Sequence, residues 1–489
     1  MVLKVIRMSV LNENKDVAFV TESPCLELFS RWVGGKEYGP KGLSFLADED
    51  PKLWNLLDKM WEESPELCVK CIFYKGDCRG GAKEKRLFMV AMNWLSTNHR
   101  DVFLSNLQHV PEYRTWKDLV LIYERMHIEQ ITELFAAQLT KDIESMKSGQ
   151  PVSLCAKWVP TERTSLDKRC PSFLRSLRLR LKCVAKDFRK NYLVPLRQHI
   201  KIVEKFMCAN EWGQIDYSQV PSVALQCYRQ LFEKHDSERF QEWIFSIKDK
   251  KGKVNVSQLF PHIVVGPYLK DARDELIEAQ FSAMVESVRR MGSFDRALVI
   301  SDTSPSMSGI PLDVSISLGI LISWCIEGPF KGTMINFSES PSFWKLTGND
   351  LHSDVRILRS LPWGGNTNLD LVFATILERA VEMKVPPCQM PNRLYILTDS
   401  QFDSSNVSGV SAIRRAKADF ALKGYEVPEI VCWNLRGGTK TSAVSDSGCC
   451  NISGYSTSVL SAIMKGKIPN PLTVMKECLL GERYERLAF

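Results

Sequence analysis

Side-chain oxygens are closely spaced at Asp302, Ser304 and Ser306, where one carboxylate and two hydroxyls stand at alternate positions. These residues follow the apolar stretch 297–301, which has the character of a buried strand, and they precede an apolar stretch with helical spacing. Hard oxygen ligands are those that a divalent cation such as Mg²⁺ prefers, so the spacing predicts a metal site. The alternative is a helix N-cap, because Asp and Ser also accept hydrogen bonds from the free N–H groups of a helix start.

Two further polar loops in the same half of the chain contain side chains with oxygen atoms that could bind a cation. Thr367 lies in a Gly-rich turn before an apolar helical pattern, and Asp399 directly follows the apolar stretch 393–398. In a doubly wound sheet such loops meet at the carboxyl ends of the strands. We therefore expect one site for Mg²⁺, or for another hard cation such as Mn²⁺ or Ca²⁺, formed by Asp302, Ser304, Ser306, Thr367 and Asp399.

The elements that must position these residues alternate between strands and helices from about residue 291 onward. Strands are predicted at 297–301, 333–337, 393–398 and 429–433, and helices at 312–326, 369–384, 408–423 and 456–464. This alternation is typical of an α/β fold with a mostly parallel sheet that is covered by helices on both faces. We expect it to occupy residues 291–489, with a helical tail at its end.

Residues 1–290 have the spacing of amphipathic helices and show no clear strand alternation. Apolar residues recur at helical intervals in 53–61, 87–95 and 116–123. Helices of this length with short connections indicate an α-helical, repeat-like domain, either a solenoid or a ring. The fold class expected for the whole chain is therefore α plus α/β.

Positive charge is concentrated in residues 163–206. Thirteen Lys and Arg residues stand there against three acidic residues, a local net charge of +10 in a chain whose total is +7. Basic helices neutralise phosphates, so RNA contact is one interpretation, an acidic protein partner is another, and a solvated helix face is the third. The candidate nucleic-acid-binding residues are Arg169, Arg175, Arg178, Arg180, Lys182, Lys186, Arg189 and Lys190. Phe173, Phe188 and Tyr192 would either stack on bases or lie in the core.

Bulk composition is that of a globular protein, with 44% hydrophobic and 25% charged residues among 489. No apolar run is long enough to cross a bilayer, and the N-terminus carries charges within its apolar stretch, so we expect no membrane partner and a cytoplasmic location. Fifteen cysteines in such a chain indicate free thiols. Cys68, Cys71 and Cys78 lack a second Cys/His pair at zinc-finger spacing, so buried thiols are expected rather than zinc.

Two other motifs invite functional interpretations that are less specific. The Arg79-Gly80-Gly81 loop lacks the spacing of a phosphate-binding loop and is expected to be a helix–helix turn, with phosphate contact as the alternative. His235 and Asp236 are expected to be a hydrogen-bonding pair at a helix end, because no nucleophile is placed with them. No catalytic triad, zinc-protease or nucleotide-binding spacing occurs, so the chain is expected not to be an enzyme.

The three oxygen-bearing loops together resemble the metal-ion-dependent adhesion site of von Willebrand factor A domains. That site combines D-x-S-x-S, a Gly-Gly-x-Thr loop and a strand-ending Thr-Asp, in the order found here. The resemblance implies that Ser304, Ser306 and Thr367 coordinate the ion, and that Asp302 and Asp399 bind it directly or through water. The chain departs from the pattern at residue 368, an Asn where many members carry an acid, and at residue 303, a Thr where Val is common.

A second resemblance covers nearly the whole chain. An uncharacterised, TROVE-like family from plants, fungi and large DNA viruses is similar to it in the segments 24–29, 79–81, 116–119, 156–160, 220–224, 235–236 and 433–436. That family joins a helical region to a von Willebrand A domain and is distantly similar to the Ro/TROVE ribonucleoproteins. The resemblance implies a non-enzymatic RNA-binding scaffold. The alternative is a protein–protein adaptor, or a virion-associated structural protein if the source is viral, that grips a partner's carboxylate through the metal.

Overall fold

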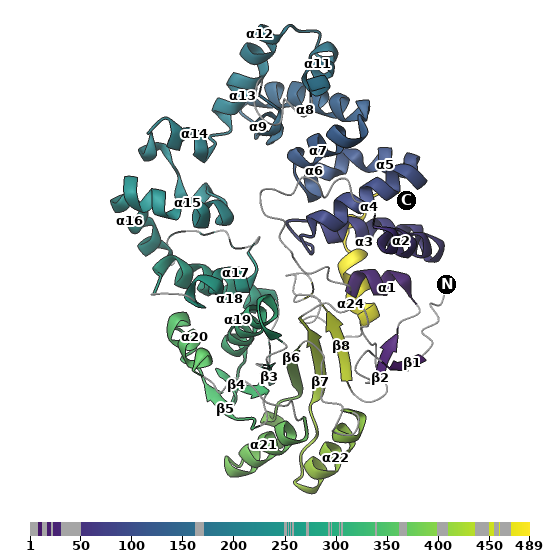
Figure 1. Ribbon diagram of the computed structural model, residues 1–489. Coiled ribbons are helices and arrows are strands. Elements are labelled where there is room, and N and C mark those ends of the chain that lie inside the picture. The colour runs from purple at the N-terminus through teal and green to yellow at the C-terminus, as the bar shows by residue number, and fades with distance from the viewer. Residues whose placement is uncertain are drawn as a thin grey trace.

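The computed structural model is a run of helices followed by an α/β part (Figure 1). It describes residues 8–11, 17–20, 23–30, 50–161, 171–248, 259–269, 273–291, 296–302, 307–337, 340–360, 369–398, 409–435, 449–453 and 471–489, with isolated positions between them that include Ser304. Among the helices of these ranges, none is long and apolar enough to cross a membrane.

Helices make up nearly all of the described part of the first 291 residues, as predicted. They are α1 (Pro24–Ser30), α2 (Pro51–Glu63), α3 (Pro65–Gly76), α4 (Lys85–Asn98), α5 (Arg100–Asn106), α6 (Val110–Tyr113), α7 (Trp116–Met126), α8 (Glu129–Lys147), α9 (Cys155–Trp158), α11 (Pro171–Arg180), α12 (Ala185–Phe188), α13 (Val194–His199), α14 (Val203–Cys208), α15 (Ser222–His235), α16 (Ser237–Lys248), α17 (Pro261–Val265) and α18 (Glu275–Met291). The exception is an antiparallel hairpin of β1 (Met8–Leu11) and β2 (Val17–Val20), which the prediction of helices alone missed.

Local sequence explains where several of these helices begin. The Asp50 side chain accepts hydrogen bonds from the N–H groups of Lys52 and Leu53, and Pro51 occupies the first turn of α2, where no N–H donor is needed. The Ser64 side chain caps α3 in the same way. At α7 the Thr115 hydroxyl binds the N–H of Asp118 while the Asp118 carboxylate binds the N–H of Thr115, a reciprocal capping box.

The α/β part contains a six-stranded sheet in the order β5–β4–β3–β6–β7–β8, parallel except for the edge strand β5. Its strands are β3 (Ala297–Asp302), β4 (Thr333–Phe337), β5 (Phe343–Lys345), β6 (Arg393–Thr398), β7 (Glu429–Asn434) and β8 (Cys449–Ser453). Its helices are α19 (Ile310–Cys325), α20 (Leu351–Arg359), α21 (Leu369–Glu382), α22 (Gly409–Leu422) and α24 (Pro471–Leu479). All four predicted strands are confirmed, whereas the two edge strands β5 and β8 were missed. The helix predicted at 456–464 lies outside the described residues.

Alternate residues of the central strands belong to two separate cores, because successive side chains of a strand point to opposite faces. Leu298 and Ile300 pack in a cluster with residues of α21 and α22. Val299 packs on the other face, in the cluster that contains the apolar side of α19 and extends through the helical region. In Figure 1, α19 lies between the sheet and α17 and α18, and α21 and α22 lie on the opposite side. The prediction of a sheet covered on both faces is confirmed.

The C-terminal tail returns to the first helices of the chain, where Figure 1 marks the C-terminus. Asp77, the fully buried C-cap residue of α3, accepts hydrogen bonds from the Arg483 guanidinium and the Tyr484 hydroxyl. The Asn106 side chain binds both the N–H and the C=O of Ala488. Because α17 and α18 pack on α19 at the other end of the helical run, the elements close into a ring.

Candidate functional site

Asp302 lies at the switch point of the sheet, where the chain turns to opposite sides of two adjacent parallel strands. It is the last residue of β3, and Thr398 is the last residue of its neighbour β6. Ligands of open α/β sheets bind at this position, beyond the carboxyl ends of the strands. The structure thus places Asp302 where the sequence-based argument requires a site.

Two hydrogen bonds fix the fully buried carboxylate of Asp302. Its Oδ2 accepts from the Thr398 hydroxyl at 2.7 Å, and its Oδ1 accepts from the N–H of Ser304 at 2.8 Å. Ser304 itself is half-buried. Thr398 had no role in the sequence-based prediction, although it belongs to the same strand-ending Thr-Asp pair as Asp399. Its hydroxyl orients Asp302 from the neighbouring strand.

Asp302 and Ser304 do not cap the helix that follows them, so that alternative is wrong. Helix α19 begins at Ile310, its N-cap is Gly309, and no side chain caps it. The φ angle of Gly309 is 88°, in the region that favours glycine. Four residues of chain therefore separate Ser304 from the N-cap position. Asp302 ends β3 and Ser304 lies two residues further on, in the loop at the end of the sheet.

The described part of the predicted metal site fits a hard cation by its chemistry. The side chains that the structure places there, Asp302, Ser304 and Thr398, carry only oxygen donors, the ligand type that Mg²⁺ prefers. Ser306, Thr367 and Asp399 lie outside the described residues. Within the described ranges no group of three His, Cys, Asp or Glu residues is arranged to hold a metal. The five-residue site therefore stays a prediction, with two of its residues placed.

The basic segment forms the part of the helical run that Figure 1 shows farthest from the sheet, around α11 and α12. Six of the candidate residues are exposed there, and Arg180 is one of them. We call the other five the basic tip: Arg175, Lys182, Lys186, Arg189 and Lys190. Arg178 is half-buried, and Arg169 lies outside the described residues. Arg180 lies 2.5 Å from Glu133 and 3.3 Å from Glu129, so its charge is paired within the protein.

The aromatic residues of this segment pack inward. Phe173 is fully buried and makes edge-on contacts with Tyr123 and Phe135, and Phe188 is 3% exposed. Tyr192 is half-buried beside Phe188. The core alternative is therefore confirmed for Phe173 and Phe188, which are not available to stack on bases. The candidate contacts of this segment are therefore its exposed charged side chains.

Arg197 lies in the basic segment but was not among the candidates, and its contacts are internal. Its guanidinium donates to the carbonyl oxygens of Ala156 and Val159 at 2.8 and 2.7 Å, which fastens α13 to the end of α9. Burial lowers the pKa of Arg197, and the neighbouring Arg189 lowers it further. The local charge of the sequence thus includes arginines that hold the scaffold together.

The Arg79-Gly80-Gly81 loop is a tight helix–helix turn between α3 and α4. The Arg79 guanidinium donates to the carbonyl oxygens of Glu112 and Arg114, at 2.5 and 2.9 Å. A Cβ at Gly81 would lie 2.0 Å from the carbonyl oxygen of Tyr74, so only glycine fits this close approach. The interpretation as a helix–helix turn is confirmed. The Arg79 guanidinium is hydrogen-bonded to backbone carbonyl oxygens within the protein.

His235 and Asp236 stand at the end of α15 with separate partners. Asp236 accepts hydrogen bonds from the Tyr217 hydroxyl and from Arg239, whereas His235 stacks on Trp212 with ring centroids 4.5 Å apart. The predicted pair lies at a helix end, as expected, but its two members do not serve as each other's partners. Their roles are structural.

The cysteines behave as buried thiols where they were considered as zinc ligands. Cys68 and Cys71 are fully buried and free, and Cys78 is half-buried. Burial raises the pKa of the Cys71 thiol to about 12 and that of Cys68 well above its usual value.

Comparisons with known proteins identify relatives of both halves. Residues 12–127 and 122–294 match the model of a domain of unknown function, DUF2828, and residues 296–477 match that of another, DUF7788. Neither description names a von Willebrand A or TROVE domain. The chain is also similar to the crystal structure of the Deinococcus radiodurans RO (RSR) protein, with 12% sequence identity and a TM-score of 0.36 over 93% of this chain and 99% of that one.

A viral protein is similar over nearly the full length. The uncharacterized protein L728 of Acanthamoeba polyphaga mimivirus is 31% identical over 507 residues, which span 96% of this chain and 86% of that protein. The DUF2828 matches together cover more than half of the chain. This chain therefore belongs to the DUF2828 family.

Proposed function

We propose that this chain is a non-enzymatic scaffold that binds RNA through the basic tip and carries a divalent cation at the switch point of its sheet. The observation that carries the proposal is the exposure of the five residues of the basic tip. They lie on α11, in the turn that follows it, on α12 and in the π-helical turn 189–193. Cations that protrude together are suited to a polyanion, because each phosphate contact releases condensed counterions.

The charge of the tip is not balanced locally. Between residues 171 and 206 the described acidic residues are Asp187 and Glu204, and Glu204 lies 3.4 Å from Lys157 of α9. The acidic residues thus neutralise little of the tip. Because the aromatic residues point inward, we expect backbone recognition rather than base stacking, and hence binding with little sequence preference.

Filter binding of a structured RNA across a salt series tests the RNA part. The wild-type protein should bind at low salt and weaken steeply as salt rises. Replacing Lys182, Lys186, Arg189 and Lys190 by Glu removes four positive charges from the basic tip. The slope of the logarithm of the association constant against the logarithm of the salt concentration should become less steep by about 3, since each phosphate contact contributes about 0.7 to 0.9 to that slope.

The matched control reverses four exposed lysines that lie elsewhere, Lys52, Lys59, Lys384 and Lys423. It changes net charge by the same amount, so it should keep most of the affinity and of the slope. Equal losses in the two variants would mean that only overall charge matters, and the proposed site would be wrong.

A second candidate, a protein adaptor that grips a partner's carboxylate through the bound cation, is favoured by the position of Asp302 at the switch point. Mg²⁺ keeps several water ligands that a partner's carboxylate can replace. Pull-downs with nuclease and with a chelator separate the candidates. Partners lost with nuclease support RNA binding, whereas partners that resist nuclease and are lost with chelator support the adaptor.

A further inference from the structure

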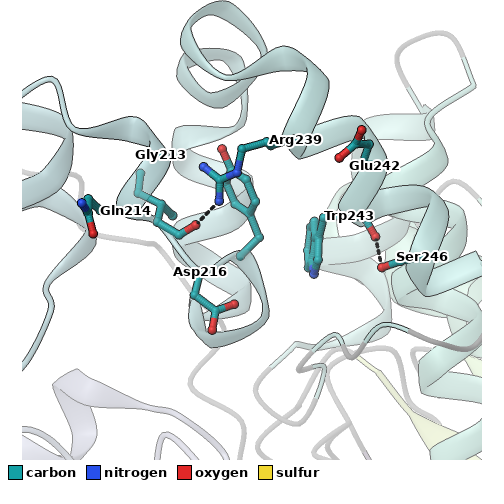
Figure 2. Close-up of a pocket in the computed structure, with 9 residues that line it drawn as sticks. Gly213, Gln214, Asp216, Arg239, Glu242, Trp243 and Ser246 are labelled. Atoms are coloured by element: carbon teal, nitrogen blue, oxygen red, sulfur yellow. Dashed lines mark hydrogen bonds between the residues drawn. The ribbon is translucent and has the colours of Figure 1, made fainter.

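An open pocket of about 530 Å³ lies in the helical run, outside the basic tip and the predicted metal site. It is formed by the short turns 212–214 and 217–219 and by one side of α16. Figure 2 shows Asp216 and Trp243 on two sides of one opening, with Arg239 and Glu242 above them. The volume is in the range of sites that hold a small ligand or a side chain with its neighbouring peptide.

Two carboxylates give the pocket its charge. Asp216 uses Oδ1 to accept from the N–H and hydroxyl of Ser218, at 3.0 and 2.7 Å, and Glu242 is an exposed residue of α16. Among the described residues, neither the second oxygen of Asp216 nor the Glu242 carboxylate has a hydrogen-bond or ion-pair partner. The pocket thus offers two unpaired negative charges, in a chain whose net charge is +7.

The one arginine of the pocket wall is already neutralised. Arg239 lies 2.8 Å from Asp236 and donates to the carbonyl oxygens of Trp212 and Ile215. Its guanidinium also lies over the ring of Tyr217, 5.7 Å from the centroid. The Arg239 guanidinium is thus surrounded by an aromatic face, a carboxylate and backbone carbonyls. This combination of groups favours the binding of a guanidinium cation.

The side of the pocket away from Arg239 offers the same kinds of group, an aromatic face and carboxylates. Trp243 provides a half-buried indole beside Tyr217, with ring centroids 5.7 Å apart, and Asp216 and Glu242 provide the carboxylates. We infer that the pocket binds a basic side chain, arginine or lysine, in an extended segment of a partner protein. RNA is a poor occupant because its phosphates would meet two carboxylates, so this site is separate from the RNA surface proposed above.

The probe is the capped pentapeptide acetyl-Gly-Ser-Arg-Ser-Gly-amide, titrated into the full-length protein by saturation-transfer NMR. We expect weak, salt-sensitive binding that is lost when citrulline, which has the shape of arginine without its charge, replaces the arginine. Glu242→Gln and Asp216→Asn should each weaken binding about fivefold or more, since each removes a charge-assisted contact. Asparagine can still cap Ser218, so Asp216→Asn keeps the local turn.

Glu238→Gln is the matched control, because Glu238 is an exposed residue of the same helix that does not line the pocket. It should bind the peptide as the wild type does. The inference is overturned if the citrulline peptide binds equally well, or if neither pocket variant differs from Glu238→Gln. It is also overturned if a tetranucleotide displaces the peptide and binds more tightly to Glu242→Gln, which would make the pocket a nucleic-acid site.

Discussion

At the residue scale, the carboxylate of Asp302 is held by the Thr398 hydroxyl and the Ser304 N–H at the end of the sheet. Asp302→Asn keeps the shape of the side chain and can still accept from the Ser304 N–H, while its amide NH₂ can donate to the Thr398 hydroxyl oxygen in place of the original bond. It removes the charge that a cation needs. A bound ion stabilises the native state by about 2.7 kcal/mol at a hundredfold excess over its Kd. We expect wild-type protein to melt at a higher temperature with Mg²⁺, and Asp302→Asn to lose that increase.

Thermal melting with Mg²⁺ and with chelator measures this effect. Asp101→Asn, which changes an exposed residue of α5, is the control and should respond to Mg²⁺ as the wild type does. If Asp302→Asn gains as much from Mg²⁺ as the control, the metal site predicted here is wrong.

The position of Asp302 was predictable because an apolar strand followed by a carboxylate places that carboxylate at the sheet edge wherever the sheet forms. The contribution of Thr398 was not predictable, since it depends on β6 lying beside β3 rather than on any spacing along the chain. The same limit applies to the basic segment. The sequence does not distinguish Arg180 and Arg197 from the other cations. In the structure, Arg180 is paired with Glu129 and Glu133, and Arg197 donates to backbone carbonyl oxygens.

At the scale of elements, the strands that were predicted are the buried central ones. β3, β6 and β7 carry uninterrupted apolar runs because both of their faces are covered. β5 has three residues and β8 begins Cys-Cys-Asn, so neither carries such a run. Each lies at an edge of the sheet and is defined by pairing with a neighbour. The starts of α2 and α3, by contrast, are marked in the sequence, where Asp50 and Ser64 precede Pro51 and Pro65.

The start of α7 is an element whose stability should depend on pH. Asp118 is 1% exposed and lies 2.9 Å from Lys85 of α4 and 3.3 Å from Arg114, besides forming the capping box with Thr115. Burial by itself would raise the pKa of Asp118, but Arg114, Lys85 and the hydrogen bonds from Lys85 and Thr115 outweigh it, and the pKa is held below its usual 3.8.

A carboxyl whose pKa is lower in the folded state stabilises the fold fully above the unfolded pKa, and this contribution is lost as pH falls through the folded value. Asp118→Asn should therefore lower the free energy of unfolding at pH 7 by about 1–3 kcal/mol. Below about pH 4, the free energy of unfolding of this variant should fall less steeply than that of the wild type. Urea unfolding from pH 7 to pH 3 measures both. A variant whose stability falls in parallel with the wild type over that range would contradict the assignment.

At the scale of the whole molecule, the ring is closed by a short tail. Asp77 is fully buried and accepts from Arg483, from Tyr484 at 2.9 Å and from the N–H of Arg79 at 2.8 Å. The Tyr113 hydroxyl donates to the carbonyl oxygen of Arg483, and its ring stacks on Tyr484. The ring also closes between the turn after α3 and α17, because the Lys83 ammonium lies 4.0 Å from the centre of the Phe260 ring.

These contacts join residues about four hundred positions apart, so the helical region and the α/β part should unfold together rather than separately. Arg483→Ala leaves the Asp77 carboxylate buried without its cation, which costs about 3 kcal/mol, the lower part of the usual range because Arg483 is about one third exposed. Arg486→Ala, which changes an exposed neighbour in the same tail, should lower the free energy of unfolding little.

Urea unfolding followed by both tryptophan fluorescence and circular dichroism measures the loss of stability and the cooperativity of unfolding. If Arg483→Ala is as stable as Arg486→Ala, the tail does not hold the ring closed. If Arg483→Ala is less stable and its two signals separate into distinct transitions, the tail is the contact that makes the two halves one cooperative unit.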